Sequence, residues 1–102
     1  MEKNKISIVV PCFNEKEALP LVYNRRTRVL NQMSQASETS GLSYELIIVD
    51  DGSMDGTLDV AKELAANDSG VKYISFSRNF GKEAAMYAGL QHAVGEYVAI
   101  MD

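Results

Sequence analysis

Several features that would place this protein outside the cell or within a membrane are missing from its sequence. A single cysteine, Cys12, stands among 102 residues, which excludes an internal disulfide and favours a reducing compartment such as the cytosol. No apolar run approaches the ~20 residues of a membrane-spanning helix. The apolar residues before Pro11 are too few for a signal peptide. We therefore expect these residues to be soluble and cytoplasmic.

The sequence also lacks an excess of basic residues. Its net charge is −4 and its isoelectric point is about 4.9, with acids and bases interspersed, so no generic nucleic-acid-binding surface is indicated. With two prolines, seven glycines, 46% hydrophobic and 24% charged residues, the composition is that of a globular chain and not of a disordered or fibrous one. The length suits one domain or less, and we find no repeat or linker.

Four short runs rich in β-branched and aromatic residues predict β-strands. The runs are "KISIVV" (5–10), "YELIIVD" (44–50), "VKYISFS" (71–77) and "EYVAIMD" (96–102). The first, second and fourth are almost continuously apolar. That pattern is typical of strands that are covered on both faces of a parallel sheet.

Three amphipathic stretches between these runs predict helices. The first covers residues ~20–37 and places Pro20 in its first turn, where the missing N–H has no helical partner in any case. The second begins after Asp55 or Ser53, either of which can act as the N-cap. The third covers residues 82–93.

The resulting order, β-α-β-α-β-α-β, predicts an α/β fold of three layers. Its parallel four-stranded sheet would have right-handed crossovers and helices on both faces. In such sheets, ligands bind beyond the carboxyl ends of the strands. The candidate functional residues are therefore those that follow each strand.

The first strand is followed by a flat apolar side chain with polar neighbours. Pro11 ends the strand, Phe13 offers an apolar face, and Asn14 and Glu15 place polar groups beside it. This combination can hold a flat base and its sugar. It is equally typical of an ordinary turn with a half-buried aromatic side chain and an acidic helix entrance, so both interpretations stay open.

Two adjacent acids, Asp50 and Asp51, end the second strand and are followed by Gly52. A carboxylate there can accept hydrogen bonds from ribose hydroxyls or a base N–H, and glycine allows a ligand to approach the backbone. The two side chains point to opposite sides of the strand, so they are not expected to share one role. For one of them, a role as a helix cap alone is a sufficient explanation. Direct Mg²⁺ binding, as in phosphoacceptor domains, is disfavoured because the third strand ends in "FSRN", without a carboxylate.

Arg78 and Lys82 follow the third strand and are the only cations near a predicted strand end on the ligand side. With Gly81 and the helix N-terminus that follows, they can bind an anion such as a diphosphate. Solvated loop charge is an equally simple interpretation. The sequence has neither G-x-G-x-x-G nor a P-loop, so dinucleotide and Walker-type binding are not supported. His92 has no partner at the spacing of metal ligands and is expected to be a partly exposed helical residue.

Three of these segments together resemble a known family. "SIVVPCFNE", "ELIIVDDGSMDGT" and "SRNFGKEAAMYAGLQHAVGEYVAIMD", in this order and spacing, resemble the family 2 glycosyltransferases of the GT-A fold. The similarity is greatest to the branch that includes dolichol-phosphate mannose synthases and bactoprenol glucosyltransferases. It covers roughly residues 5–102. It implies that residues 1–102 form the nucleotide-sugar-binding half of a Rossmann-like GT-A domain.

The resemblance also implies a site. The implied nucleotide-binding residues are Pro11, Phe13, Glu15, Val49, Asp51, Gly52, Arg78 and Lys82. Within this set Asp51 is expected to contact the base, while Asp50 has a mainly structural role. Asp102 matches the first acid of the family's D-x-D motif, which binds Mg²⁺ or Mn²⁺ on the diphosphate of the donor. Catalytic residues are expected beyond residue 102.

By the same resemblance, the full-length protein is expected to transfer a hexose, with inversion, from a UDP- or GDP-sugar to a polyprenyl phosphate at the cytoplasmic face of a membrane. The acceptor half and any membrane segments would follow residue 102. This chain alone is therefore expected to be inactive, and its open sheet edge to favour self-association. Two alternatives stay open: a family 2 transferase that builds polysaccharide or glycan, and a non-catalytic α/β nucleotide-binding or regulatory module.

Overall fold

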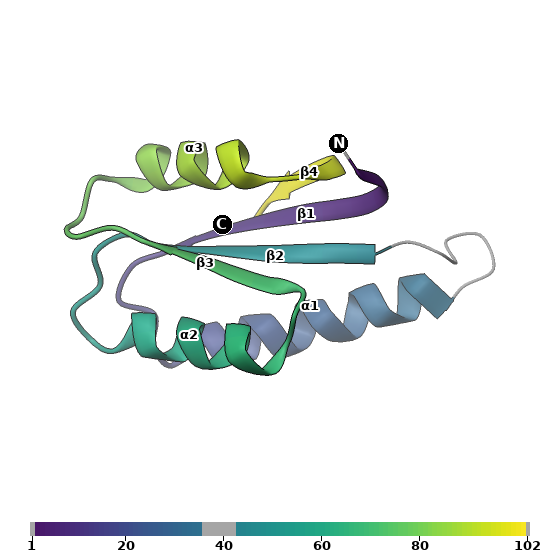
Figure 1. Cartoon of the computed structure of the whole chain (residues 1–102). Coiled ribbons are helices and arrows are strands. Elements are labelled where there is room, and N and C mark those ends of the chain that lie inside the picture. Colours follow the sequence, from purple (N-terminus) through teal and green to yellow (C-terminus); the bar gives the residue numbers. More distant parts are fainter. Residues whose placement is uncertain (1, 36–42, 102) are drawn as a thin grey trace.

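Strands and helices alternate along the whole of the described chain. A computed structural model describes residues 2–35 and 43–101. The elements are β1 (Glu2–Cys12), α1 (Ala18–Gln35), β2 (Ser43–Asp50), α2 (Thr57–Asn67), β3 (Val71–Ser75), α3 (Lys82–His92) and β4 (Gly95–Ile100). The strands pair in parallel in the order β3-β2-β1-β4. Figure 1 shows α3 on one face of this sheet and α1 and α2 on the other, which confirms the predicted three-layer α/β fold.

Alternating side chains of β1 and β2 build a separate core on each face of the sheet. The core beneath α1 and α2 contains Ile8, Val10, Cys12, Leu19, Leu46, Ile48, Ala61 and Val71. The core beneath α3 contains Val9, Ile47, Val49 and Ala85. Because β1 and β2 are the two central strands and carry apolar side chains on both faces, they are covered as their sequences predict.

The helix starts differ from the sequence prediction by a few residues. α1 begins at Ala18, so Pro20 is its third residue and still lies in the first turn. α2 begins at Thr57, and its N-cap is Gly56 at φ 94°, so the prediction of Asp55 or Ser53 as N-cap was wrong. Asp55 lies one residue too early for that position.

Asp55 Oδ1 still accepts the N–H of Thr57, the first residue of α2 (3.0 Å), and Ser53 and Asp55 also join two loops at the carboxyl edge of the sheet. Ser53 Oγ accepts a hydrogen bond from the Asn14 N–H (2.7 Å), and Asp55 Oδ2 accepts one from the Lys16 N–H (3.2 Å). Asn14 Oδ1 in turn accepts the Met54 N–H (2.9 Å). The β1–α1 and β2–α2 loops therefore hold each other in place.

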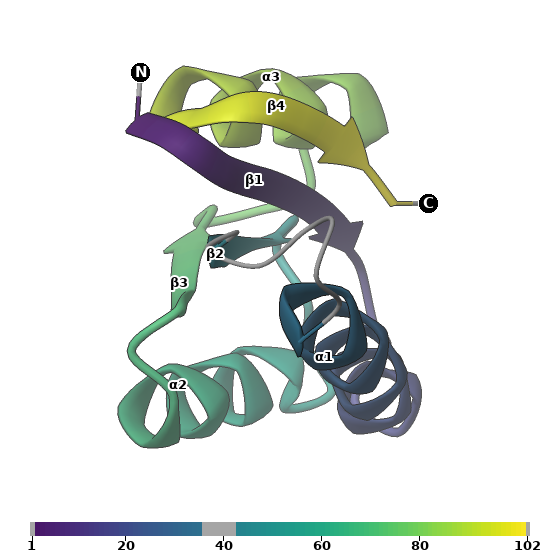
Figure 2. The same cartoon turned by 90° about the vertical axis from the view of Figure 1, so that its right-hand side faces the viewer.

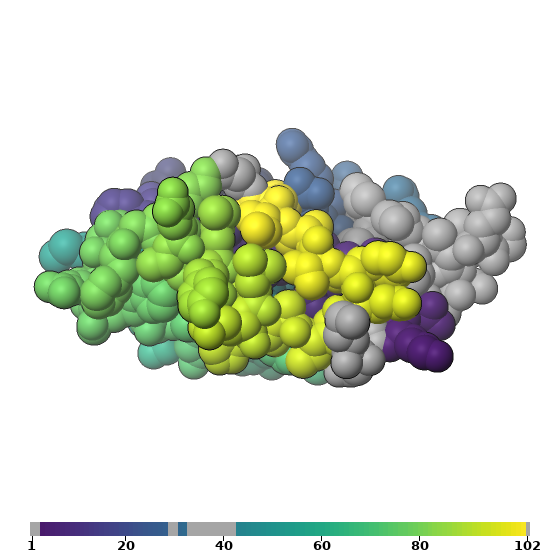
Figure 3. Space-filling model, turned by 90° about the horizontal axis from the view of Figure 1, so that it is seen from above, coloured from purple at the N-terminus to yellow at the C-terminus, as the bar shows by residue number. Residues whose placement is uncertain are grey.

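The expectation that the fourth strand is covered on both faces was wrong for the described residues. β4 lies at the sheet edge beside β1, as Figure 2 shows. Only Gly95 is buried in it, whereas Tyr97, Val98 and Ile100 are 60%, 45% and 43% exposed. Figure 3 shows β4 at the surface next to α3. An apolar sequence favours burial, but burial needs a covering element, and the part of the chain described here supplies none.

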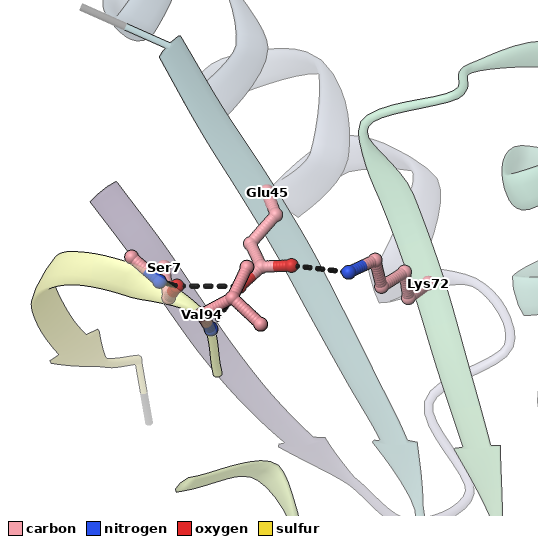
Figure 4. Close-up of polar contacts among 5 residues, drawn as sticks. Ser7, Glu45, Lys72 and Val94 are labelled. Carbon is pink, nitrogen blue, oxygen red and sulfur yellow. Dashed lines mark hydrogen bonds and ion pairs between the residues drawn. The ribbon is translucent and has the colours of Figure 1, made fainter. Parts of the chain in front are cut away.

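A buried carboxylate, Glu45, fixes the connection between α3 and β4. Glu45, on β2, is 1% exposed, and its Oε2 accepts hydrogen bonds from Ser7 Oγ (2.5 Å) and the Val94 N–H (2.8 Å). Its Oε1 pairs with Lys72 Nζ at 2.7 Å (Figure 4). Ser7 Oγ also accepts the Gly95 N–H (2.8 Å). Because the buried carboxylate finds partners on β1, on β3 and in the α3–β4 connection, it holds these segments together.

Candidate functional site

A cleft of about 120 Å³ opens at the carboxyl ends of the central strands. It is lined by Pro11, Cys12, Phe13, Glu15, Asp51 and Lys82. All of these except Cys12 are candidates from the sequence, and they come from the end of β1 and its following loop, the residue after β2 and the start of α3. β1 continues through Pro11 to Cys12, so the prediction that Pro11 ends the strand was wrong by one residue. The topology therefore brings together three segments that are far apart in the chain.

A second hollow, of about 420 Å³, shares Phe13 with the cleft. Two further candidates, Gly52 and Arg78, line it together with Asp50. Phe13 is 43% exposed and contributes to the walls of both hollows. The eight residues implied for nucleotide binding are thus divided between two neighbouring hollows, with one exception described below.

The carboxylate of Asp51 is bonded to the loop that leads into α3. Asp51 is 4% exposed. Its Oδ1 accepts the Phe80 N–H (2.8 Å), and its Oδ2 accepts the Gly81 N–H (3.1 Å) and Asn79 Nδ2 (3.2 Å). The Asp51 N–H donates to the Cys12 carbonyl (2.9 Å). Asp51 is thus fixed to β1 by its backbone and holds the β3–α3 loop with its side chain.

Gly52 lies in the left-handed region of φ, at 75°. A Cβ at this position would stand within 2.7 Å of three backbone atoms of Arg78 and Asn79. The sequence predicted that glycine here lets a ligand approach the backbone closely. In the structure it is the β3–α3 loop that packs closely on Gly52. Contact between Gly52 and a nucleotide stays a prediction.

Asp50 faces a different loop from Asp51. It is 1% exposed, and its Oδ1 accepts the Ser53 N–H at 3.4 Å, within the turn toward α2.

Burial, and then the nearby charges of Asp50 and Glu15, raise the pKa of the Cys12 thiol to about 12. Cys12 is therefore a neutral thiol at physiological pH and not a nucleophile.

Arg78 is placed by an aromatic side chain. Its guanidinium carbon lies 4.8 Å from the centroid of the Phe80 ring, which is a cation–π contact. Phe80 in turn meets Phe76 edge to face, with ring centroids 5.6 Å apart. The guanidinium is exposed at the edge of the second hollow, where it can meet an anion. The sequence had given no reason to single out Asn79 or Phe80, because their roles depend on contacts with Asp51 and Arg78.

Three remaining predictions have different outcomes. Val49 is fully buried in the core beneath α3 and lines neither hollow, so its contact with a nucleotide stays a prediction. It is the next-to-last residue of β2, and strand alternation turns its side chain toward the core beneath α3. His92 is exposed, as predicted, with Nδ1 2.9 Å from the Ala88 carbonyl. Asp102 lies outside the described residues.

Among residues 2–35 and 43–101, no group of three His, Cys, Asp or Glu side chains could hold a metal ion. The same residues contain no helix that is both long and apolar enough to cross a membrane.

The sheet order, the layers and the cleft at the carboxyl edge define an α/β domain of the ligand-binding type. Residues 7–102 match the protein family that is described as "Glycosyl transferase family 2". The chain therefore belongs to glycosyl transferase family 2.

Named relatives agree with this assignment. "Putative glycosyltransferase CsbB" of Bacillus subtilis (strain 168) is 43% identical over 102 residues, which is 100% of this chain and 29% of that protein. "Bactoprenol glucosyl transferase" of Shigella phage SfV is 42% identical over 98 residues, 96% of this chain and 30% of that protein. The crystal structure of S. aureus TarS 1-349 in complex with UDP matches with a TM-score of 0.67 and 26% identity, over 96% of this chain and 27% of that one. The chain thus spans under a third of the length of these relatives.

Proposed function

We propose that this chain is the donor-binding part of a glycosyltransferase that moves a hexose from a UDP- or GDP-sugar to a polyprenyl phosphate. The observation that carries the proposal is the cleft that joins Phe13, Asp51 and Lys82 at one edge of the sheet. Two relatives support the substrate classes, since one is named a bactoprenol glucosyl transferase and another was solved with UDP.

Each part of the proposed donor has a chemically suitable partner. The exposed face of Phe13 can stack on a nucleobase, and the Glu15 carboxylate can accept hydrogen bonds from ribose hydroxyls. Lys82 lines the same cleft at the first turn of α3, where backbone N–H groups and the helix dipole favour an anion. Arg78 adds a second cation for the diphosphate.

The transfer step itself would depend on groups outside the described residues. These are an acceptor site, a catalytic base for inversion and a Mg²⁺ or Mn²⁺ ion held with Asp102, and the threefold greater length of the relatives supports their presence in a longer protein. We expect the chain alone to bind nucleotide without transferring sugar. The full-length protein would act at the cytoplasmic face of a membrane, where polyprenyl phosphates lie.

Calorimetric titration of UDP and GDP into the chain, with and without Mn²⁺, tests the proposal. We expect one of the two nucleotides to bind, and Phe13→Ala to weaken that binding about tenfold or more, because stacking on an aromatic side chain contributes ~1–3 kcal/mol per base. Tyr97→Ala, which removes an exposed aromatic side chain from β4, is the matched control and should change nothing. Binding of neither nucleotide would contradict the proposal. Phosphorylation of the chain by acetyl phosphate would also contradict it and would favour a regulatory module.

A further inference from the structure

Phe13 stands between two backbone groups that are hydrogen-bonded to the segment after β2. Before it, the Cys12 carbonyl accepts the Asp51 N–H (2.9 Å). After it, the Asn14 N–H donates to Ser53 Oγ (2.7 Å). The side chain of Phe13 is 43% exposed and lies in the wall of both hollows. Because much of this side chain is not packed, the anchoring of its two neighbours contributes to its placement.

Asn14 has an unusual backbone for a residue with a side chain. Its φ is 53°, in the left-handed region, where non-glycine residues are uncommon and asparagine is enriched. The bend at this position turns the chain from β1, which ends at Cys12, toward α1, which begins at Ala18. Such backbone conformations persist where the surroundings enforce them, and they are concentrated at functional sites. Here the strained residue directly follows the proposed stacking residue.

The side chain of Asn14 closes this bend onto the neighbouring loop. Its Oδ1 accepts the Met54 N–H (2.9 Å), while its own N–H donates to Ser53 Oγ. One residue thus makes a reciprocal pair of bonds to two consecutive residues of the β2–α2 loop. Met54 is 93% exposed, so its attachment to Asn14 runs through the backbone and not through packing.

The next residue carries the attachment into the protein interior. The Glu15 N–H donates to Thr57 Oγ1 (2.9 Å), and Thr57 is fully buried. Thr57 Oγ1 in turn donates its proton to Asp55 Oδ1, which leaves the hydroxyl oxygen as the acceptor for Glu15. Asn14 and Glu15 are therefore anchored one after the other to the segment that opens α2.

We propose that Asn14 is a positioning residue that fixes the Phe13 ring for stacking on the nucleobase, through its left-handed backbone and its bonds to the β2–α2 loop. The inference rests on the proposed function of the cleft. Asn14 lines neither of the two hollows, so its effect on affinity passes through its neighbour. Arg78 and Lys82 belong to a different segment, so the contribution of the diphosphate is expected to be independent of Asn14.

Three substitutions separate the backbone of Asn14 from its side chain. Asn14→Gly allows the left-handed backbone but removes Oδ1, Asn14→Ala also strains the backbone, and Asn14→Asp keeps both features. By amide hydrogen exchange without ligand, we expect the Met54 N–H to lose about threefold protection or more in the Gly and Ala variants only. Equal Met54 exchange in wild type and Asn14→Ala would overturn the proposal.

Nucleoside binding tests the step from the loop to the ring. By NMR titration with uridine and with guanosine, we expect Asn14→Ala to lower the affinity of the nucleoside that binds about tenfold, and Asn14→Asp to restore it. Neutral nucleosides are the probes because the added carboxylate would repel a diphosphate. Ser53→Ala removes the acceptor of the Asn14 N–H and should also lower the affinity. Unchanged nucleoside affinity in Asn14→Ala would overturn the proposal.

Asn4 offers the matched control. Among the residues that the structure describes, it is the other non-glycine residue with a positive φ, 58°, and it lies near the amino end of β1, away from the cleft. Asn4→Ala therefore introduces the same kind of backbone strain. We expect it to lower the free energy of unfolding without changing nucleoside affinity. Equal loss of affinity in Asn4→Ala and Asn14→Ala would indicate general destabilisation and overturn the positioning role.

A double-variant cycle shows whether Asn14 acts through Phe13. We expect Phe13→Ala with Asn14→Ala to weaken nucleoside binding by less than the product of the two single effects, because the ring that Asn14 positions is already absent. In Asn14→Ala, the ratio of diphosphate to nucleoside affinity should stay within about twofold of wild type, since distant sites act independently. Single effects that multiply, or a lower ratio, would show that Asn14 acts on the nucleotide by another route and would overturn the inference.

Failure of this inference differs from failure of the proposed function. If the wild-type chain binds no nucleoside and no diphosphate, the donor-binding function fails, and the positioning role fails with it. If wild type binds a nucleoside and Asn14→Ala binds it equally well, only the positioning role fails. Loss of Met54 protection together with loss of nucleoside affinity, both restored in Asn14→Asp, supports it.

Discussion

The Tyr23 hydroxyl donates a hydrogen bond of 2.6 Å to Asp68 Oδ2 and so joins α1 to the turn between α2 and β3. The same oxygen accepts the Tyr44 hydroxyl at 3.3 Å, and Asp68 Oδ1 accepts the Gly70 N–H at 2.8 Å. The bond to Asp68, followed by burial, raises the pKa of Tyr23 to about 12. One carboxylate thus links three segments on the α1 and α2 face of the sheet.

This raised pKa predicts a loss of stability at high pH. Because the folded pKa of Tyr23 lies above the ordinary value of about 10, its stabilising effect is complete below pH ~10 and disappears as the pH rises through ~12. Tyr23→Phe should lower the free energy of unfolding by about 1–2 kcal/mol at pH 7. Urea unfolding at pH 7 and pH 12 should show this difference at the lower pH only. Tyr44→Phe, which removes the longer bond, should cost less, and an equal cost would contradict the assignment.

Glu45 predicts a loss of stability in acid. Burial acts to raise its pKa, but the hydrogen bonds from Lys72, Ser7 and the Val94 N–H outweigh burial, and the pKa is lowered. Its stabilising effect is therefore present above pH ~4.5 and is lost as the pH falls through the folded pKa. Glu45→Gln should cost about 1–3 kcal/mol at pH 7. In urea unfolding, the difference in the free energy of unfolding between wild type and Glu45→Gln should become smaller toward pH 3.

The control for this acid effect is Glu63→Gln, which changes an exposed acid of α2. It should leave the free energy of unfolding within about 0.5 kcal/mol of wild type at every pH. A gap between wild type and Glu45→Gln that stays constant from pH 7 to pH 3 would show that shape, and not charge, explains the role of Glu45.

Two glycines with positive φ should tolerate substitution differently. Gly52 and Gly56 have φ of 75° and 94°. At Gly56, the nearest atom to an added Cβ is 3.4 Å away on the flexible Lys16 side chain, so Gly56→Ala should cost only the ~1–2 kcal/mol of the backbone conformation. At Gly52 the loop backbone fills the space, so Gly52→Ala should cost more than Gly56→Ala and loosen the β3–α3 loop. Equal costs in urea unfolding would contradict the loop packing at Gly52.

Cys12 should be unreactive in the folded chain. It is 4% exposed, its Sγ lies 3.6 Å from the Val49 carbonyl, and its pKa is raised to about 12. At pH 8 we expect a thiol reagent such as iodoacetamide to label Cys12 only as fast as the chain unfolds, so Gly52→Ala should accelerate labelling and Gly56→Ala less so. Rapid labelling of wild type in native buffer would show that the cleft opens at Cys12 without unfolding.

The fold was readable from the sequence because apolar runs and helical stripes alternate regularly. Parallel pairing then brings the carboxyl ends to one edge, which is why Phe13, Asp51 and Lys82 could be expected in one cleft. The contacts of Asp51 could not be read in the same way. Its partners lie 28 to 30 residues away, and two of them are backbone N–H groups, which every residue type except proline offers. The burial of Val49 likewise depends on which face α3 covers.

α3 is attached at both of its ends, to β2 and to the residue that follows β2. Asp51 bonds the residues just before it, and Glu45 bonds the Val94 N–H just after it. A helix of 11 residues is about 16 Å long and resists bending. Because both ends of this rigid helix are bonded, α3 fixes the distance between the cleft loop and the start of β4.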